Sequence, residues 1–174
     1  MNNINLEKLR ETIEKLSKDP SLRRTKQTVS GEWNTSDPTK PQFKSSIKTE
    51  KGEYTLFADL PVPQGGNALA PAPIPYCLFG IASCFASTLV TVATLEGKRI
   101  DRLKLDITAD MNMSRVFGLE DAPIIEKVTI LVDLKIEGES EETLRTLIRL
   151  AEERCPAAYT LTRGTKLEVQ LKKS

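Results

Sequence analysis

The chain has 174 residues, a net charge of +1, 39% apolar and 28% charged residues, and no histidine. This length and composition suggest one folded domain, and the near-neutral charge excludes the basic surface that nucleic-acid binding needs. Without histidine, Ser–His and Cys–His pairs are excluded and the commonest metal ligand is missing. We therefore expect no nucleic-acid partner, no metal and no cofactor.

The N-terminal segment is charged and amphipathic. Leucine and isoleucine recur at helical spacing at positions 6, 9, 13 and 16, and Asp19-Pro20 follows. This pattern predicts an amphipathic helix within residues 1–20, which precedes a domain over residues 21–174. A secretory leader has an apolar core that this segment lacks, so we expect a cytoplasmic protein.

Three strands are expected in the next part of the chain. Residues 25–33 predict a first strand with Gly31 at a bend. Residues 42–48 and 53–60 predict a hairpin joined at Glu50-Lys51-Gly52. A loop rich in Pro, Gly and Ala follows. Its Gly65-Gly66 pair could bring the backbone close to a site or serve a sharp turn, and both interpretations stay open.

An uncharged stretch, residues 76–95, lies in the middle of the chain and carries Cys77 and Cys84. Its length suits a membrane-spanning helix as well as a core helix covered on every side. We favour the core helix and expect no membrane partner. Ser and Thr interrupt the stretch, prolines precede it, and Gly97 with Lys98 makes an ordinary helix end.

The second half predicts two strands, two helices and a last strand. Residues 103–111 and 128–136 alternate between apolar and polar, which is typical of half-buried strands. Ser140 then caps a helix whose apolar stripe ends at Cys155. The Cys-Pro pair predicts that Cys155 caps a further short helix. Alternating apolar residues at 167, 169 and 171 predict the last strand. This order of elements indicates an α+β fold with mostly antiparallel sheets.

The three cysteines can be interpreted in two ways. Free cysteines are often buried as small apolar side chains, and burial alone leaves a thiol unreactive. We assign Cys77 to the core on this ground. A reactive thiol needs a nearby cation or a helix N-terminus. Arg23 and Arg24 could supply the cation, and Cys155 lies at an expected helix N-terminus.

The segments PAPIPYCLFGIASCFASTL, IDRLKLDITAD and LIRLAEERCPAAYTL resemble the OsmC/Ohr family of osmotically inducible and organic-hydroperoxide-resistance proteins. The resemblance runs from about Gly65 to the C-terminus. It implies an α+β fold in which two long central helices are enclosed by antiparallel sheets of an intertwined homodimer. It also implies a thiol peroxidase in which Cys84 attacks an organic hydroperoxide, Cys155 forms a disulfide with it, and a dithiol reductant restores both thiols.

The sequence departs from the family pattern at one position. Where the family peroxidases carry a Glu that pairs with a catalytic Arg, this chain has Ile74. The Arg has no clear equivalent, and Arg23 and Arg24 are candidates by region only. The departure favours a second possibility, a non-enzymatic dimer of the same fold that binds a small apolar ligand or carries sulfur on a thiol.

Overall fold

The computed structural model describes residues 1–172, which form two compact units. The larger unit comprises residues 1–9 and the chain from residue 79 onward, and the smaller unit comprises residues 10–78. Two helices cross this boundary, α1 (Leu6–Lys18) and α2 (Pro73–Leu95). The first of them is the predicted N-terminal amphipathic helix.

A three-stranded antiparallel sheet in the order β1-β2-β3 forms the body of the smaller unit. Its strands are β1 (Ser30–Trp33), β2 (Phe43–Thr49) and β3 (Gly52–Ala58). Phe43 pairs with Ala58, so β2 and β3 form the predicted hairpin. The first strand is shorter than predicted, because only residues 30–33 find partners, at residues 43–46 of β2.

One face of this sheet carries large apolar side chains that remain exposed. Trp33 pairs with Phe43 and Ile47 pairs with Tyr54, and directly opposed residues share a face. Their side chains are between 37% and 58% exposed. We call these four residues the sheet patch.

The loop that joins β3 to α2 is held by its own backbone. It contains a short helix, η2 (Val62–Gln64), which ends at Gly65 with a left-handed φ of 85°. A side chain at Gly66 would collide with the carbonyl oxygen of Leu60. Buried Asp59 accepts a hydrogen bond from the Leu69 N–H at 3.0 Å. The glycines therefore serve a turn and close packing within the smaller unit.

Helix α2 begins earlier than the uncharged stretch, because Pro73 and Pro75 fit the first turn of a helix. Five of its side chains are buried, namely Phe85, Leu89, Val92, Ala93 and Thr94. The expectation that the helix is covered on every side is wrong for this chain, since residues nearer its start stay open and Phe79 is 70% exposed. By length and composition α2 could cross a membrane, but a single such helix is weak evidence because core helices of soluble proteins share these properties.

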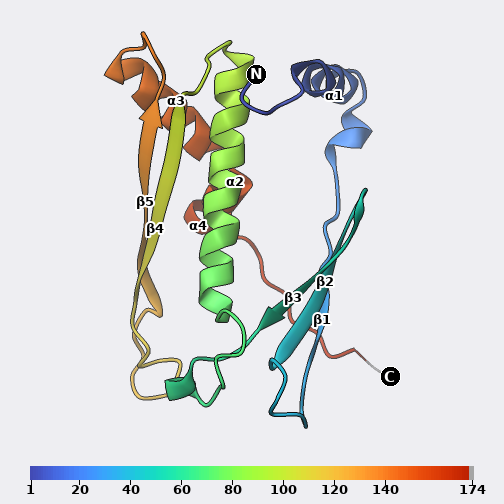
Figure 1. The fold of residues 1–174 in the computed structure, drawn as a ribbon, viewed down its shortest axis with the longest axis vertical. Coiled ribbons are helices and arrows are strands. Elements are labelled where there is room, and N and C mark those ends of the chain that lie inside the picture. Colours follow the sequence, from blue (N-terminus) through green and yellow to red (C-terminus); the bar gives the residue numbers. More distant parts are fainter. Residues whose placement is uncertain (173–174) are drawn as a thin grey trace. The chain divides into compact units, whose positions relative to one another are not determined.

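The rest of the larger unit packs against α2. A hairpin of β4 (Arg102–Met111) and β5 (Ile125–Lys135) pairs Leu105 with Val132. The hairpin lies along α2 in Figure 1. Helices α3 (Glu141–Arg154) and α4 (Pro156–Arg163) lie behind the hairpin and α2. Phe85, Leu89, Leu147, Ala151 and Cys155 belong to one buried cluster that these elements share. Both predicted strands and both predicted helices are confirmed.

The predicted last strand is wrong. Residues 165–172 have no regular structure, and Leu167, Val169 and Leu171 are 84%, 88% and 92% exposed. Within the described chain, no strand pairs with this segment. An alternating pattern identifies a segment that can enter a sheet, but a strand forms only where a partner edge exists.

Candidate active site

Cys84 lies in the middle of α2, on a stripe next to the buried face of that helix. It is half-buried and carries a free thiol. Ile81 lies one helical turn before it, and Phe85, the next residue, is buried in the core. The Thr88 hydroxyl donates to the Cys84 carbonyl at 2.9 Å, which satisfies the hydroxyl within the helix. The helix therefore holds the Cys84 thiol in a fixed place at the edge of the core.

Cys155 lies at the junction of α3 and α4. Its N–H donates to the Ala151 carbonyl at 2.8 Å, so it ends α3. Pro156 then starts α4, and the Cys155 sulfur accepts a hydrogen bond from the Ala158 N–H at 3.5 Å. Cys155 is thus the N-cap of α4, as its Cys-Pro pair predicts, and its side chain is fully buried.

The two sulfur atoms are in contact. The Cys155 thiol donates to the Cys84 sulfur, and the two Sγ atoms are 3.6 Å apart although the residues are 71 positions apart in sequence. Both cysteines are free thiols. A disulfide needs a sulfur–sulfur distance of about 2 Å, so a small movement of either side chain would allow the bond to form.

Burial and local dipoles act on the Cys84 thiol in opposite directions. Burial is the largest effect and raises its pKa above the usual value for cysteine. The backbone N–H of Ala157, in the first turn of α4, counteracts this rise by stabilising the thiolate. The neighbouring Cys155 thiol contributes a smaller rise. The N-terminus of α4 is therefore the positive group beside this sulfur.

No arginine side chain donates to either sulfur within residues 1–172. Arg23 and Arg24 belong to the smaller unit, where the Arg23 Nε donates to the Leu16 carbonyl at 2.8 Å. Ile74 lies in the first turn of α2, in the same unit. The structure thus brings together Cys84 and Cys155 within the larger unit, whereas both arginines belong to the smaller unit.

The prediction that Cys77 belongs to the core is wrong. Cys77 is exposed, although its neighbour Tyr76 is half-buried and donates its hydroxyl to the Phe57 carbonyl at 2.9 Å. It lies two helical turns before Cys84. The described residues contain no group of three or more Cys, Asp or Glu side chains that could hold a metal ion.

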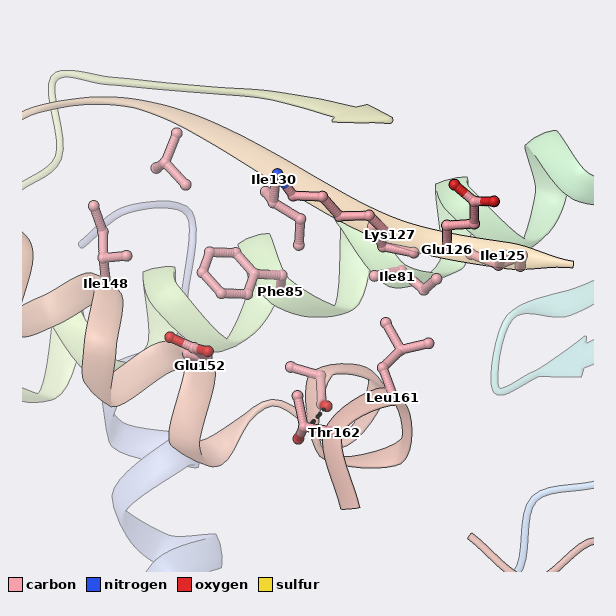
Figure 2. A pocket seen from close by; sticks show the side chains of 13 residues that line it. Ile81, Phe85, Ile125, Glu126, Lys127, Ile130, Ile148, Glu152, Leu161 and Thr162 are labelled. Atoms are coloured by element: carbon pink, nitrogen blue, oxygen red, sulfur yellow. Dashed lines mark hydrogen bonds between the residues drawn. The ribbon is translucent and has the colours of Figure 1, made fainter. Parts of the chain in front are cut away.

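A pocket of about 540 Å³ lies next to the thiol pair, in the range of small-molecule sites. Figure 2 shows Phe85 of α2, Ile130 of β5 and Ile148 of α3 around it. Leu161 and Thr162 of α4 close another side, and the rim carries charged residues, namely Glu126, Lys127 and Glu152. The sequence analysis missed this pocket, because it is assembled from four elements. The one local sign of this pocket in the sequence is the alternation of apolar residues in β5.

The pocket and the thiol pair share structural elements. Ala158, whose N–H contacts the Cys155 sulfur, also lines the pocket, as does Phe85, which follows Cys84. The two cysteines themselves are not among the lining residues. The pocket therefore lies beside the two cysteines in the fold, because residues next to each of them line it.

Residues 65–170 match a family model described as OsmC-like protein. The chain belongs to this family. The match covers the second part of the loop after β3, the thiol pair and the pocket, which confirms the resemblance found in the sequence. No curated protein matches the chain.

Solved structures of OsmC-like proteins share the fold at low sequence identity. An OsmC-like protein from Mycoplasma pneumoniae has a TM-score of 0.60 and 20% identity, over 80% of this chain and 89% of that one. An organic hydroperoxide resistance protein OsmC from Legionella pneumophila has a TM-score of 0.55 and 17% identity, over 80% and 92%. One from Elizabethkingia anophelis has a TM-score of 0.52 and 20% identity, over 81% and 91%. The predicted α+β fold with antiparallel sheets is confirmed.

Proposed function

We propose that this OsmC-like protein is a thiol-dependent peroxidase that reduces organic hydroperoxides. The contact between the Cys84 and Cys155 sulfur atoms, 3.6 Å apart, is the observation that supports this function best. Two free thiols held in contact are suited to the sequence of thiolate, sulfenic acid and disulfide.

The exposure of the two thiols supports the roles proposed for them. Cys84 is half-buried and can be reached, whereas Cys155 is fully buried. The Cys84 thiolate attacks the outer peroxide oxygen, the O–O bond breaks, and the departing alkoxide takes a proton to become the alcohol. Cys155 then attacks the Cys84 sulfenic acid as a thiolate, the S–O bond breaks, and the hydroxide takes a proton to become water. A dithiol reductant finally returns both thiols and is itself oxidised to a disulfide.

The N-terminus of α4 stabilises negative charge on both sulfur atoms during these steps. The Ala157 N–H acts on Cys84 and the Ala158 N–H donates to Cys155. Arg23 or Arg24 is proposed to add a guanidinium to the assembled site, the role for which the sequence analysis names them. Without the Glu that Ile74 replaces, this arginine lacks its carboxylate partner.

The pocket beside the thiols favours hydroperoxides with an apolar part. Its walls are formed mostly by aliphatic and aromatic side chains, including Ile81, Phe85 and Leu161. An alkyl or aryl group gains free energy there by leaving water, at roughly 25 cal/mol per Å² of apolar surface buried. Hydrogen peroxide has no such group, so we expect it to be the poorer substrate.

The protein is proposed to act as a cytoplasmic homodimer. Two exposed apolar surfaces support this assembly: the sheet patch, and the α2 face that carries Phe79, Gly80 and Ser83. Surfaces of this kind commonly mark protein–protein interfaces. Small residues such as Gly80 and Ser83 would also allow a second helix to approach closely.

The raised pKa of Cys84 favours a second function, a dimer that binds an apolar ligand or carries sulfur without turning over peroxide.

Peroxide consumption distinguishes the peroxidase from this second function. Reduced protein with a dithiol is mixed with cumene hydroperoxide, and the remaining peroxide is measured over time. We expect Cys84→Ser to lower the rate more than about a thousandfold and the matched control Cys77→Ser to react like the natural chain. Cys155→Ser should turn over more slowly, because the dithiol must then reduce the Cys84 sulfenic acid directly. Equal rates for Cys84→Ser and the natural chain would exclude the peroxidase.

A further inference from the structure

Helix α4 takes part in both features of the site. Its N-cap is Cys155, and its residues Ala158, Leu161 and Thr162 form one side of the apolar pocket. The helix has only eight residues, of which Ala158 alone is buried. A short helix with so few buried side chains depends strongly on its cap and first turn.

The Cys155 sulfur holds that first turn through a single contact, the hydrogen bond from the Ala158 N–H at 3.5 Å. When Cys84 and Cys155 form a disulfide, their sulfur atoms must approach from 3.6 Å to about 2 Å. The Cys155 sulfur then moves toward α2, loses its thiol hydrogen and becomes a neutral disulfide sulfur. The sulfur is a neutral acceptor in both states, so what changes for the Ala158 N–H is the position of the sulfur that it contacts.

We infer that α4 couples the redox state of the two cysteines to the pocket, so that disulfide formation weakens the binding of an apolar ligand there. The Ala158 turn shifts with the Cys155 sulfur, and Leu161 and Thr162 move with that turn. Because coupling is reciprocal, an apolar ligand in the pocket also disfavours the disulfide. The biological role of this coupling rests on the proposed function. In a peroxidase, disulfide formation would release the alcohol product from the pocket before the dithiol reductant acts.

The test compares ligand binding in the two redox states without using peroxide. The full chain with Cys77→Ser is reduced with dithiothreitol or oxidised with diamide. Diamide accepts two electrons and two protons from the two thiols and becomes the corresponding hydrazine. N-phenyl-1-naphthylamine, an uncharged apolar fluorophore, is then titrated into each form. Hydrogen exchange of the α4 amides is measured in parallel.

We expect the oxidised form to bind the fluorophore about fivefold or more weakly and its α4 amides to exchange faster. In Cys77→Ser/Cys155→Ser, which cannot form the bond, diamide should change neither quantity. Leu161→Ser should weaken binding in the reduced form and so place the fluorophore in the pocket. The Leu161 side chain is 50% exposed, so we expect the Leu161→Ser variant to fold.

Equal affinity and equal exchange in the two redox states would overturn the coupling, and so would the absence of a Cys84–Cys155 disulfide after diamide. Failure to consume cumene hydroperoxide, with the redox-dependent affinity retained, would instead overturn the peroxidase and leave the coupling in place. Unchanged fluorophore affinity in Leu161→Ser would also count against the coupling, because the ligand would then bind elsewhere.

Discussion

Cys84, the proposed nucleophile, has few groups beside it that could stabilise a thiolate. Burial raises the pKa of its thiol, and the Ala157 N–H is the one group beside it that lowers the pKa. A backbone amide carries only a partial charge, so it stabilises a thiolate less than a full guanidinium would. At neutral pH the thiol form therefore dominates at Cys84.

The pH dependence of alkylation tests this view of Cys84. In Cys77→Ser/Cys155→Ser, where Cys84 is the remaining thiol, the rate of reaction with iodoacetamide should rise about tenfold per pH unit. The rise should continue past the usual cysteine pKa, because burial raises the pKa of Cys84. Levelling of the rate near neutral pH would show instead that a cation holds the thiolate.

The same raised pKa makes folding stability depend on pH. The folded chain keeps the Cys84 proton to higher pH than the unfolded chain does, so it binds more protons in that window. This contribution to stability is complete below the unfolded pKa and is lost as pH rises through the folded pKa. Urea midpoints should therefore fall at alkaline pH more in the natural chain than in Cys84→Ser. Parallel curves for the two would contradict the raised pKa.

At the scale of elements, the local signals of the sequence predicted most of the fold. Ser140 accepts the Thr143 N–H at 3.2 Å and starts α3 as expected, and Cys155 caps α4. These features depend on residues a few positions apart. The contact between Cys84 and Cys155, the pocket and the exposure of Cys77 depend on how separate elements pack. Periodicity within one element carries no information on such packing.

The cap of α3 permits a separate test of stability and activity. Ser140→Ala removes the acceptor for the Thr143 N–H and should lower the free energy of unfolding by about 1 kcal/mol. Ser140→Thr keeps a capping hydroxyl and should lose less. The rate of Cys84 oxidation should stay the same in both variants, since the cap lies at the far end of α3 from Cys155. A matching loss of rate in Ser140→Ala would show that the thiol pair depends on α3 as a whole.

At the scale of the whole molecule, a single chain leaves apolar surface exposed in both units. The sheet patch lies in the smaller unit, and Phe79 of α2 is 70% exposed in the larger one. Leu167, Val169 and Leu171 add an alternating apolar segment that has no strand partner in the described chain. A second copy would account for all three surfaces.

Light scattering during size-exclusion chromatography tests this assembly. The natural chain should have twice the mass of one chain. Phe79→Glu should shift it toward the monomer, because a carboxylate at an apolar interface loses its hydration. Leu119→Glu is the matched control, since exposed Leu119 lies in a bend outside the three surfaces named above and the variant should leave the dimer intact. A natural chain that is monomeric at all concentrations would contradict the dimer.

The most direct test of the peroxidase is the product of a single turnover. Reduced protein receives one equivalent of cumene hydroperoxide without a reductant, and its intact mass and peptide map are then measured. The peroxidase predicts that two hydrogens are lost, that one disulfide joins Cys84 to Cys155, and that one equivalent of cumyl alcohol forms. An unchanged mass with peroxide left over, or oxidation confined to exposed Cys77, would contradict it.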